Sequence, residues 1–329
     1  MKKITANIIG IDFYVPDTIM TNDDFAKFLD TNDEWITERT GIKQRHILKD
    51  KDKANVFLAV NAAKKVFEKT KIDPKTIDLL ILTTATPELQ FPATANMVAY
   101  ELGCTNAWSF DIMAACSGFL YTLQTAAQFI QCGTHKRIMI IGSEKMSSIL
   151  DFTDRKSCIL FGDGAGAAIL EANEEGYGIL DASLYSDGYG KQFLYQPAGG
   201  SLKPASEETV KNKEHFVKME GQAVFKYAVV KMADACEEVM KRNNLKNEDL
   251  KYLVSHQANK RIITATADRL GLTPEQTYIN IERYGNTTTA SIPICLTEIS
   301  GNLKKGDNLI ISSFGAGFTW GAIFLKWGI

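Results

Sequence analysis

One cysteine stands where a predicted strand gives way to a predicted helix. Cys116 follows an apolar run that ends at Ala115, and apolar residues from Phe119 to Ile130 then recur at three- and four-residue spacings. Cys116 is therefore expected at or near a helix start. Unpaired N–H groups and the positive end of the helix dipole favour a thiolate there, so we expect a nucleophile with a lowered pKa. A free cysteine is more often a small buried hydrophobe, and this segment alone leaves that alternative open.

Two polar residues and a glycine-rich turn extend the candidate set. His256 follows a predicted strand, Asn286 precedes a predicted helix, and residues 314–321 (FGAGFTWG) form a turn between two strands. Singly, these features are also typical of a half-buried histidine, a helix-capping asparagine and an ordinary β-turn. As a set they suit acyl chemistry, in which Cys116 attacks a thioester and N–H groups of Cys116 and of the turn 315–317 hold the oxyanion. His256 and Asn286 would then donate hydrogen bonds to a second carbonyl.

The elements that must position these residues occur twice in the chain. Three pairs of segments match in one order: 71–82 with 244–255, 108–126 with 278–296, and 136–144 with 307–315. Their offsets are 173, 170 and 171 residues, so we infer an internal duplication. Each half is rich in strands and helices, which predicts an α/β fold. The acidic segment 171–178 marks the expected boundary between halves of residues 1–172 and 173–329.

The duplication also predicts where the candidate residues meet. An offset of 170 places Asn286 opposite Cys116, and an offset of 173 places His256 opposite Thr83. All three candidates then fall at the carboxyl ends of strands, where ligand sites of α/β sheets usually lie. The segment GDGAG (162–166) matches neither common phosphate-binding motif and is interpreted as the tight turn of a hairpin.

Composition argues against several other classes of function. The 329 residues carry a net charge of −2, so no overall basic character points to nucleic acid. No apolar run is long enough to span a membrane, and the first residues lack the apolar core of a signal peptide. The six cysteines have neither metal-ligand spacing nor a dense framework, so no metal site and no disulfide scaffold are expected. We therefore expect a cytoplasmic, reduced protein.

Seven segments in one order carry a resemblance to a known family. They are DEWITERTGIKQRHI (33–47), AACSG (114–118), TDRKS (153–157), FGDGAGAA (161–168), SHQANKRI (255–262), RYGNTTTASIP (283–293) and FGAGFTWG (314–321). With these motifs the chain resembles β-ketoacyl-acyl-carrier-protein synthase III, of the thiolase superfamily, over nearly its full length. The resemblance implies a thiolase-like, five-layered αβαβα fold from two duplicated halves, working as a homodimer.

The resemblance also implies an acyltransferase that initiates fatty acid synthesis. An acyl-CoA primer, often acetyl-CoA, would acylate Cys116. Malonyl-acyl-carrier protein would then lose CO2, and its carbanion would attack the acyl-cysteine to give 3-oxoacyl-acyl-carrier protein. Hydrogen bonds from His256 Nε2 and Asn286 Nδ2 would stabilise the enolate. His256 would not be needed chiefly as the base for Cys116, because the helix start already lowers the pKa of the cysteine. The CoA thioester is a substrate, so no cofactor and no metal are implied.

Further motif positions imply contacts to CoA and to the oxyanion. Those for CoA are Trp35 and Arg155 at the adenine end, Arg39 and Asn259 at the pantetheine-phosphate region, and Gly221, which leaves space along the channel. The oxyanion would be held by the backbone N–H groups of Cys116 and Ala316. The family commonly has glycine at the position of Ala316, and its extra methyl group must point away from the oxyanion.

The same resemblance implies an acyl pocket and a docking patch. Phe314 would line the acyl pocket, and Phe91 resembles the residue that enters the pocket of the partner subunit. A basic patch of Lys226, Arg261 and Arg269 would attract the acidic carrier protein despite the net charge of −2. Residues 186–218 match the family poorly and are expected to form an extended excursion.

Three alternatives remain at this point. The chain could prime with branched or longer acyl groups in secondary metabolism, as a related thiolase-fold condensing enzyme. A Cys-His-Asn set also serves cysteine hydrolases, although those lack the duplicated order of elements. A non-catalytic thiolase-fold scaffold would be expected to lack the nucleophile, and Cys116 is present.

Overall fold

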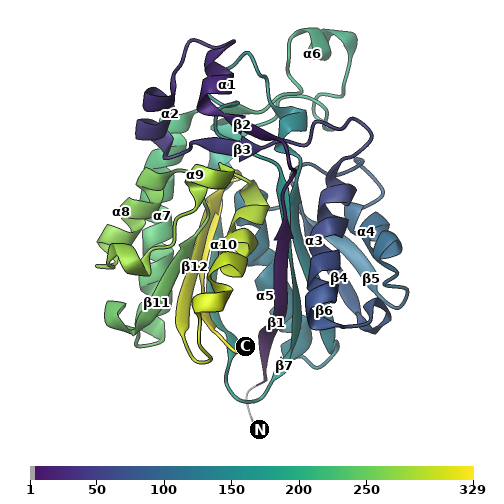
Figure 1. Ribbon diagram of the computed structural model, residues 1–329, viewed down its shortest axis with the longest axis vertical. Helices are drawn as coiled ribbons and strands as arrows, with labels where there is room; N and C mark the ends of the chain where they lie inside the picture. Colours follow the sequence, from purple (N-terminus) through teal and green to yellow (C-terminus); the bar gives the residue numbers. More distant parts are fainter. Residues whose placement is uncertain (1–3) are drawn as a thin grey trace.

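The computed structural model describes residues 4–329, in which strands and helices alternate along the chain (Figure 1). Its strands are β1 (Thr5–Tyr14), β2 (Ile19–Thr21), β3 (Gln44–His46), β4 (Leu79–Thr83), β5 (Trp108–Ile112), β6 (Arg137–Glu144), β7 (Gly164–Asn173), β8 (Gly178–Ser186), β9 (Leu194–Tyr195), β10 (Lys218–Met219), β11 (Leu250–Ser255), β12 (Asn308–Gly315) and β13 (Thr319–Lys326).

The α-helices are α1 (Asn22–Ala26), α2 (Asp33–Thr40), α3 (Asn55–Thr70), α4 (Thr94–Leu102), α5 (Gly118–Gln131), α6 (Glu207–Lys211), α7 (Gly221–Arg242), α8 (Lys260–Arg269), α9 (Ile281–Tyr284) and α10 (Ser291–Ile299). Short 3-10 helices are η1 (Pro74–Thr76), η2 (Ala115–Ser117), η3 (Met146–Ile149), η4 (Gly188–Gln192), η5 (Asn247–Asp249), η6 (Pro274–Gln276), η7 (Thr288–Ala290) and η8 (Ser300–Asn302).

Nine strands of residues 4–329 join one sheet, in the order β11-β12-β13-β8-β1-β7-β6-β4-β5. Strand β4 runs parallel to β5 and β6, β11 runs parallel to β12, and the other neighbours are antiparallel. In the middle of the sheet, β1 and β8 share one residue pair, Ala6 with Ile179. The sheet therefore has two parts, β1-β7-β6-β4-β5 and β8-β13-β12-β11, which meet at a narrow junction.

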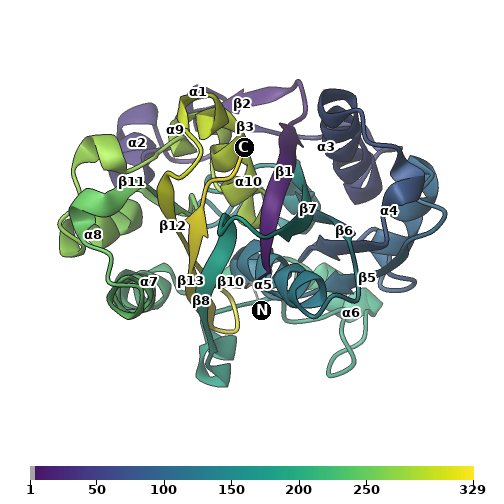
Figure 2. The same ribbon diagram turned by 90° about the horizontal axis from the view of Figure 1, so that it is seen from below.

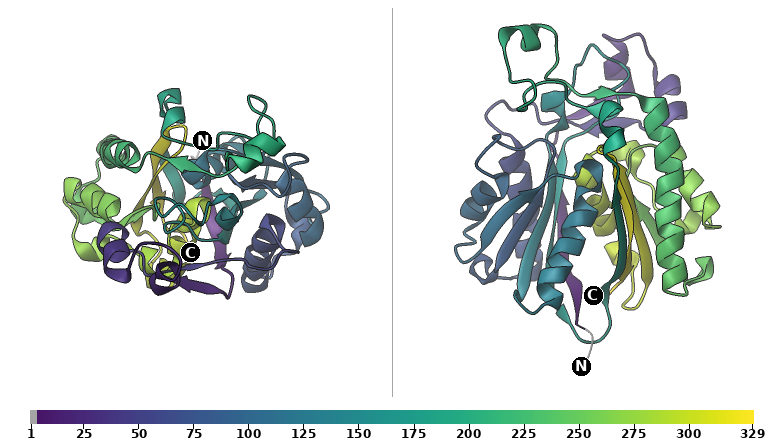
Figure 3. Two further views of the ribbon diagram at one scale, coloured as in Figure 1. Left: turned by 90° about the horizontal axis from the view of Figure 1, so that it is seen from above. Right: turned by 180° about the vertical axis from the view of Figure 1, so that it is seen from behind.

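Helices cover the two outer faces of the sheet and fill the space between its parts (Figures 2 and 3). Helix α3 packs on β1, β7 and β6 with α4 beside it, while α7 packs on β13, β12 and β8 with α8 beside it. Between the parts, α5 contacts β6, β1, β4 and β8, and α10 contacts β1, β7 and β11. The layers run helix, sheet, helix, sheet, helix, which confirms the predicted αβαβα fold.

Strand β4 shows why the sequence gives this layering. All five of its residues are buried, as expected for a parallel strand covered on both faces. Leu79 and Ile81 join the central hydrophobic cluster around α5 and α10, whereas Leu80 and Leu82 join the cluster beneath α3 and α4. Because successive side chains of a strand point to opposite faces, one apolar run supplies two cores.

The two central helices begin in the same way, which makes the internal duplication visible. Helix η2 leads into α5 and η7 leads into α10, and their first residues, Ala115 and Thr288, each have a φ of +46°. Because these residues match, Cys116 corresponds to Thr289. The predicted offset of 170, which set Asn286 opposite Cys116, is therefore wrong. Residues 281–284 form α9, whereas the matched segment of the first half forms strand β5, so the second half reaches its turn by a different path from the first.

The hairpin predicted at residues 162–166 is also wrong. Residues 157–160 form turns, Phe161 makes an isolated bridge with Asn286, and β7 begins only at Gly164. Strand β7 then pairs with β6 on one side and β1 on the other, so the chain does not fold back on itself at the glycines. The segment instead carries a strand into the middle of the sheet and places Phe161 beside Asn286.

The chain passes from one part of the sheet to the other between Asn173, where β7 ends, and Gly178, where β8 begins. The boundary between residues 172 and 173 stays a prediction. The excursion at 186–218 carries η4, β9 and the short α6, and β9 pairs with β10. Across residues 4–329, no helix is long and apolar enough to cross a bilayer, and no group of three His, Cys, Asp or Glu side chains is arranged to hold a metal ion.

Candidate active site

Cys116 lies in η2, between β5 and α5, and is clamped there by the other half of the molecule. Its side chain is nearly buried, at 8% exposed. Ser313 Oγ on β12 donates to the Cys116 carbonyl over 2.8 Å. On β13, Thr319 Oγ1 donates to the Ala114 carbonyl, and Ser117 Oγ donates to the Thr319 carbonyl, both over 2.9 Å. The C-terminal half therefore fixes the backbone on both sides of the cysteine.

Gly315 brings the glycine-rich turn directly against η2. A Cβ atom at Gly315 would lie 2.7 Å from Cys116 N and 3.0 Å from Ser117 N, so no larger residue fits without displacing the backbone. The turn that follows carries Ala316, the predicted second oxyanion donor. Among residues 4–329, the N–H groups of Cys116 and Ala316 donate no hydrogen bond to another residue. Both donors are therefore available to a ligand.

The pKa of Cys116 differs from the sequence-based expectation. Burial, followed by the negative charge of Glu144, raises the pKa of the thiol to about 12, while its own backbone N–H acts in the opposite direction. The prediction of a lowered pKa is therefore wrong. Helix α5 begins only at Gly118, so Cys116 lies one short turn before the helix in an enclosed place, where desolvation of a thiolate outweighs the helix terminus.

Glu144 is a fully buried carboxylate that the sequence analysis missed. It ends β6 and accepts hydrogen bonds from Ala85 N, Thr86 Oγ1 and Thr289 Oγ1 over 3.0, 2.7 and 3.1 Å. Burial raises its pKa, and these donors act against that shift. Glu144 thereby ties η7 to the segment after β4. A charged residue soon after the apolar run 138–142 was the one available signal.

His256 directly follows β11, as predicted, and is held by both backbone and side chain. Its backbone N–H donates to the Ser312 carbonyl over 2.8 Å, and Nδ1 lies 2.7 Å from Ser291 Oγ. The ring is 2% exposed, and Nε2 has no hydrogen-bond partner among residues 4–329. Burial lowers the pKa of His256 to about 3, so the imidazole is neutral at pH 7.

Asn286 presents the amide nitrogen of its side chain because the oxygen is already engaged. Asn286 Oδ1 accepts from Thr288 N over 2.9 Å, and among the described residues Nδ2 has no partner. The backbone is fixed by hydrogen bonds from Asn286 N to the Leu160 carbonyl at 2.9 Å and from Gly162 N to the Asn286 carbonyl at 3.0 Å. The segment between β6 and β7 therefore holds Asn286 in place.

A buried arginine supports this segment from behind. Arg45 is fully buried, and its guanidinium donates to the Ile159 carbonyl and, over 2.7 Å, to Asn22 Oδ1. Burial lowers the pKa of Arg45 to about 9. A Cβ atom at Gly285, whose φ is +65°, would lie 2.9 Å from Arg45 Cγ. Arg45 therefore contacts the backbone of both segments that pair at the bridge between Phe161 and Asn286. Only its burial in the structure reveals this role.

The three predicted catalytic residues share one frame. The consecutive serines Ser312 and Ser313 of β12 bind the backbones of His256 and Cys116 respectively. Ser291 links the His256 ring to η7, because its hydroxyl also lies 2.9 Å from the Thr288 carbonyl. Helices η2 and η7 contact each other. Cys116 and His256 therefore lie after strands β5 and β11 as predicted, whereas Asn286 follows helix α9 and is joined to them through η7.

Four of the five predicted CoA contacts also form one cluster. The Arg39 and Arg155 guanidinium groups lie 4.4 and 5.2 Å from the centre of the Trp35 ring. Asn259 Nδ2 donates to the Arg39 carbonyl over 2.9 Å, while its Oδ1 caps α8. Gly221 begins α7, where an added Cβ would meet only the Met219 methyl group at 3.9 Å. The protein itself therefore does not require glycine at that position.

The predicted docking residues differ in their surroundings. Lys226 is exposed on α7, and the Arg261 guanidinium lies 5.3 Å from the centre of the neighbouring Phe225 ring. Arg269 forms ion pairs with Asp234 at 2.6 Å and Glu237 at 2.7 Å. Its charge is compensated within the protein, so Arg269 is a poor candidate for attracting an acidic partner.

The two phenylalanines predicted for the acyl pocket lie in opposite environments. Phe91 is 85% exposed in the segment between β4 and α4. Phe314 is buried on β12, and its ring centre lies 4.7 Å from that of Phe318 and 6.4 Å from that of Trp320, in the cluster beneath α7. The pocket assignment of both residues stays a prediction.

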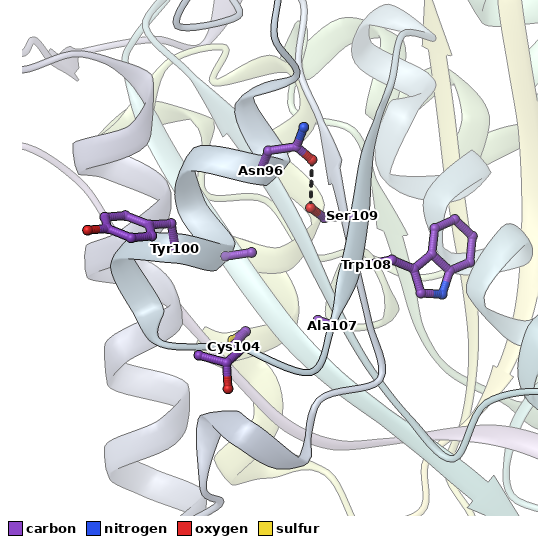
Figure 4. A pocket seen from close by; sticks show the side chains of 8 residues that line it. Asn96, Tyr100, Cys104, Ala107, Trp108 and Ser109 are labelled. Atoms are coloured by element: carbon purple, nitrogen blue, oxygen red, sulfur yellow. Dashed lines mark hydrogen bonds between the residues drawn. The ribbon is translucent and has the colours of Figure 1, made fainter.

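A surface hollow that includes none of the predicted site residues lies between α4 and the edge strand β5 (Figure 4). It is lined by Asn96, Ala99, Tyr100, Cys104, Thr105, Ala107, Trp108 and Ser109. Ser109 Oγ on β5 donates to Asn96 Oδ1 on α4 over 2.7 Å, which spans one side of the hollow. No group of nucleophile, base and oxyanion donors lies there.

Comparisons with known proteins identify the family of the chain. Residues 110–188 match the family model of 3-oxoacyl-[acyl-carrier-protein (ACP)] synthase III, and residues 240–327 match its C-terminal model. The β-ketoacyl-[acyl-carrier-protein] synthase III of Porphyromonas gingivalis W83 is 53% identical over 327 residues, covering 99% of this chain and 98% of that protein. The synthase III of Chlorobaculum tepidum is 55% identical over 318 residues, covering 95% and 97%.

Comparison with solved structures identifies the same family. The crystal structure of 3-oxoacyl-[acyl-carrier-protein] synthase III from Aquifex aeolicus VF5 matches with a TM-score of 0.90 and 40% identity, covering 98% of this chain and all of that one. The synthase III structure from Thermus thermophilus matches with a TM-score of 0.90 and 38% identity, covering 98% of this chain and 99% of that one. The chain belongs to the β-ketoacyl-[acyl-carrier-protein] synthase III family.

Proposed function

We propose that this protein catalyses the initiating condensation of fatty acid synthesis, with Cys116, His256 and Asn286 as its catalytic residues. The primer is an acyl-CoA, and the extender is malonyl-acyl-carrier protein. One observation carries the proposal: β12 holds the backbones of Cys116 and His256 through adjacent serines and then packs Gly315 against Cys116 N, while the N–H groups of Cys116 and of the following Ala316 donate to no other described residue. Acyl transfer through a thioester needs that combination of nucleophile, imidazole and oxyanion site.

In the first half-reaction, Cys116 attacks the thioester carbonyl of the primer. The developing oxyanion accepts hydrogen bonds from the N–H groups of Cys116 and Ala316. These donors are fixed before the substrate arrives, because Gly315 packs on Cys116 N and Ser313 holds the Cys116 carbonyl. Removing one such donor from an oxyanion site typically costs about 10²–10³ in rate. The CoA thiol leaves, and the acyl group remains on the sulfur.

In the second half-reaction, decarboxylation of the malonyl thioester builds negative charge on its carbonyl oxygen. Asn286 Nδ2 and His256 Nε2 are the two unpartnered nitrogen atoms that would face this oxygen. Both lie in a nearly dry site, where hydrogen bonds to a developing charge are stronger than in water. The enolate carbon then attacks the acyl-cysteine and releases 3-oxoacyl-acyl-carrier protein.

Substrate recognition is assigned to the rim of the site. Trp35 with Arg39 and Arg155 supplies an aromatic face and two cations for the nucleotide end of CoA. Asn259 fixes the backbone of Arg39 from the second half. Lys226 and Arg261 are the cations that we assign to the acidic carrier protein. Arg269 is left out because two carboxylates already bind it.

We further propose that the enzyme is a homodimer formed along β5. This strand ends the sheet, so one row of its backbone hydrogen-bonding groups faces outward, and an exposed edge favours pairing with another chain. Trp108 on β5 is 49% exposed and Met113 just after it is 67% exposed. Phe91 lies on a nearby exposed loop, and a second copy across β5 would give that side chain a place to insert. The hollow of Figure 4 borders the same edge.

The cysteines fit a reducing compartment, and we assign the enzyme to the cytoplasm. All six are free thiols in the structure, including the exposed Cys132. The alternative of a branched or longer primer in a secondary pathway is not favoured, because relatives at about half identity carry the synthase III name over nearly their full length.

The proposed function is tested by intact-mass measurement after incubation with acetyl-CoA and longer acyl-CoAs. We expect one acyl adduct per chain, located on Cys116 by peptide mapping. The absence of an adduct with every thioester tried would contradict the proposal. Malonyl-carrier-protein decarboxylation by Asn286→Ala and His256→Ala variants tests the second step, and undiminished decarboxylation in both would refute the enolate assignment.

A further inference from the structure

Glu144 joins two segments that come from the two halves of the chain. On one side, its carboxylate accepts hydrogen bonds from Ala85 N and from the hydroxyls of Thr84 and Thr86, over 3.0, 3.2 and 2.7 Å. On the other side, it accepts one from the hydroxyl of Thr289 in η7 over 3.1 Å. Glu144 is fully buried, and hydrogen bonds to a buried carboxylate are stronger than those between neutral groups. The carboxylate therefore fixes the position of η7 relative to the segment that follows β4.

The segment that follows β4, residues 84–93, is a fixed support because other elements hold it as well. Near its middle, Glu88 Oε2 accepts a hydrogen bond from Val56 N in the first turn of α3 over 2.8 Å. At its end, Asp111 on β5 accepts one from Thr94 N, where α4 begins, over 2.7 Å. Helix α3 and strand β5 thus hold the middle and the end of this segment, and the carboxylate at the end of β6 holds its start.

Strand β6 contacts Thr289 from two positions on one face. Glu144 binds the hydroxyl, and Gly142 lies so close that an added Cβ would be 2.6 Å from the Thr289 carbonyl oxygen. Residues two apart in a strand point to the same face, so both contacts come from one side. They fix the side chain and the backbone of Thr289 together, which leaves η7 little room to shift against β6.

The position of η7 in turn determines the direction of the Asn286 amide. Asn286 Oδ1 accepts a hydrogen bond from Thr288 N, at the start of η7, over 2.9 Å, and this is the hydrogen bond of that side chain within residues 4–329. The backbone of Asn286 is held separately, by the Leu160 carbonyl. A shift of η7 would therefore turn Asn286 Nδ2 while leaving its backbone in place.

We propose that Glu144 is a positioning residue for the decarboxylation half-reaction, because it holds η7 where Asn286 Nδ2 points at the malonyl carbonyl oxygen. The proposal rests on the proposed function, in which Asn286 stabilises the enolate. Glu144 acts through Thr289 and η7 rather than on a substrate. Acylation of Cys116 takes place at the other turn, η2, whose backbone is fixed by β12 and β13. The two half-reactions therefore depend on Glu144 to different extents.

The internal duplication argues against a merely structural role for this carboxylate. Strands β6 and β12 have the same length and are 171 positions apart, so the counterpart of Glu144 is Gly315, just as the counterpart of Thr289 is Cys116. Both pairs of positions meet, since Gly315 packs against Cys116 N. A need common to both turns would be met in both halves. The carboxylate is present only in the half whose turn orients Asn286.

Two variants of Thr289 test the proposal while keeping the carboxylate. Thr289→Val keeps the shape of the side chain and removes the hydroxyl, whereas Thr289→Ser keeps the hydroxyl. With Thr289→Val we expect malonyl-carrier-protein decarboxylation to slow by about tenfold or more, since misplacing a group costs less than removing it. Single-turnover acylation by acetyl-CoA should stay near the wild-type rate. Thr289→Ser should restore decarboxylation.

A second variant loosens the same connection from the other side. Thr86→Val removes a hydroxyl that binds Glu144, and it should give a smaller loss of the same selective kind because Ala85 N still binds the carboxylate. Thr5→Ala is the matched control, since its hydroxyl is also buried and its bond to the Asn173 carbonyl, over 3.2 Å, lies outside this network. Undiminished decarboxylation in Thr289→Val, or an equal loss in both half-reactions, would overturn the proposal.

Crystal structures of the wild-type protein and of Thr289→Val in one crystal form give a readout that needs no activity. We expect Asn286 Nδ2 to move by about 0.5 Å or more, the tolerance within which a catalytic group has to be held. An unmoved Asn286 side chain would overturn the proposal. A failure of the proposed function would show differently, as a missing acyl adduct on Cys116 of the wild-type protein.

Discussion

The two turns η2 and η7 begin with the same backbone conformation and have different tasks. Each starts at a φ of +46° and leads into a central helix, and each is pressed against a glycine of the opposite strand. A Cβ at Gly315 would lie 2.7 Å from Cys116 N, and a Cβ at Gly142 would lie 2.6 Å from the Thr289 carbonyl. Past the glycine, however, β6 ends in the buried Glu144, whereas β12 ends at Gly315 and leads into the turn with Ala316.

The difference shows how a duplicated fold yields one reactive centre. Around η7, Thr289 Oγ1 donates a hydrogen bond to the buried Glu144 carboxylate over 3.1 Å, so the residue that corresponds to Cys116 is used within the protein. Around η2, the N–H groups of Cys116 and Ala316 donate to no other described residue, and Ser313 and Thr319 of the second half fix the backbone beside the cysteine. Turn η7 is used for structural support, whereas turn η2 is available to the substrate.

The largest expected difference between the turns is in the nucleophile. We expect Cys116→Ala to give no acyl adduct after incubation with acyl-CoA, since no other side chain occupies the oxyanion site. Thr289→Ala, at the corresponding position of η7, should still form one adduct per chain. Intact-mass measurement of both variants makes the comparison. An adduct on Cys116→Ala at wild-type yield would show that the nucleophile lies elsewhere.

Substitutions of the two glycines that contact the turns should affect different quantities. Gly315 should control the acylation rate, and Gly142 should control the free energy of unfolding. Gly315→Ala displaces the backbone of Cys116, and we expect acylation to slow by about 10²-fold, as for a small misplacement of reacting groups. Gly142→Ala overpacks the supporting turn and should lower the free energy of unfolding by about 1–3 kcal/mol. Single-turnover acylation and urea denaturation measure the two effects. If Gly142→Ala slows acylation as much as Gly315→Ala while remaining folded, the turns are not functionally distinct.

A comparable effect on stability, without an effect on the nucleophile, is expected from the hydroxyl of Thr289. Its hydrogen bond to Glu144 joins η7 to the segment after β4, so Thr289→Ala should lower the free energy of unfolding by about 1.5–3 kcal/mol, the usual range for a hydrogen bond to a charged group. Thr289→Ser keeps the hydroxyl and should lose less. Urea midpoints of both variants provide the measurement, and equal midpoints would exclude a role for this bond.

The smallest effect of a substitution is expected on the pKa of Cys116. Because the pKa is raised to about 12, alkylation by iodoacetamide should accelerate about tenfold per pH unit between pH 7 and 9 without reaching a plateau. Glu144→Gln removes a negative charge that raises this pKa, so alkylation at pH 8 should become a few times faster. Cys132→Ser is included in every protein, since Cys132 is exposed and would react first. A plateau near pH 7 would instead restore the lowered pKa inferred from the sequence.

The sequence predicted the layers, the nucleophile and its two partners because those features are local or repeated. Cys116 and His256 each follow a predicted strand, and periodic apolar residues marked the helices around them. The sequence predicted less well which residue of one half corresponds to which residue of the other. Residues 281–284 carry a strand-like pattern but form α9, so the match between Asn286 and Cys116 was displaced by three positions.

Residues whose role comes from burial could not be recognised in the sequence. Glu144 and Arg45 look like ordinary charged residues until their neighbours exclude water. Ser291 is one of many serines, and its three partners come from two separate segments. Arg269 has the right charge for docking, yet Asp234 and Glu237 on another helix already bind it. In each case, the deciding contact joins residues that are distant in the chain.

The single residue pair between β1 and β8 has a consequence for how the enzyme matures. Each part of the sheet can complete its own strands with almost no contribution from the other, but the reactive centre is divided between them. Cys116 comes from the earlier half of the chain, whereas Ser313, Gly315 and His256 come from the later half. A nascent chain that has folded only its first half therefore carries an ordinary cysteine. Thioesters in the cell meet a competent enzyme only after synthesis has ended and the halves have docked.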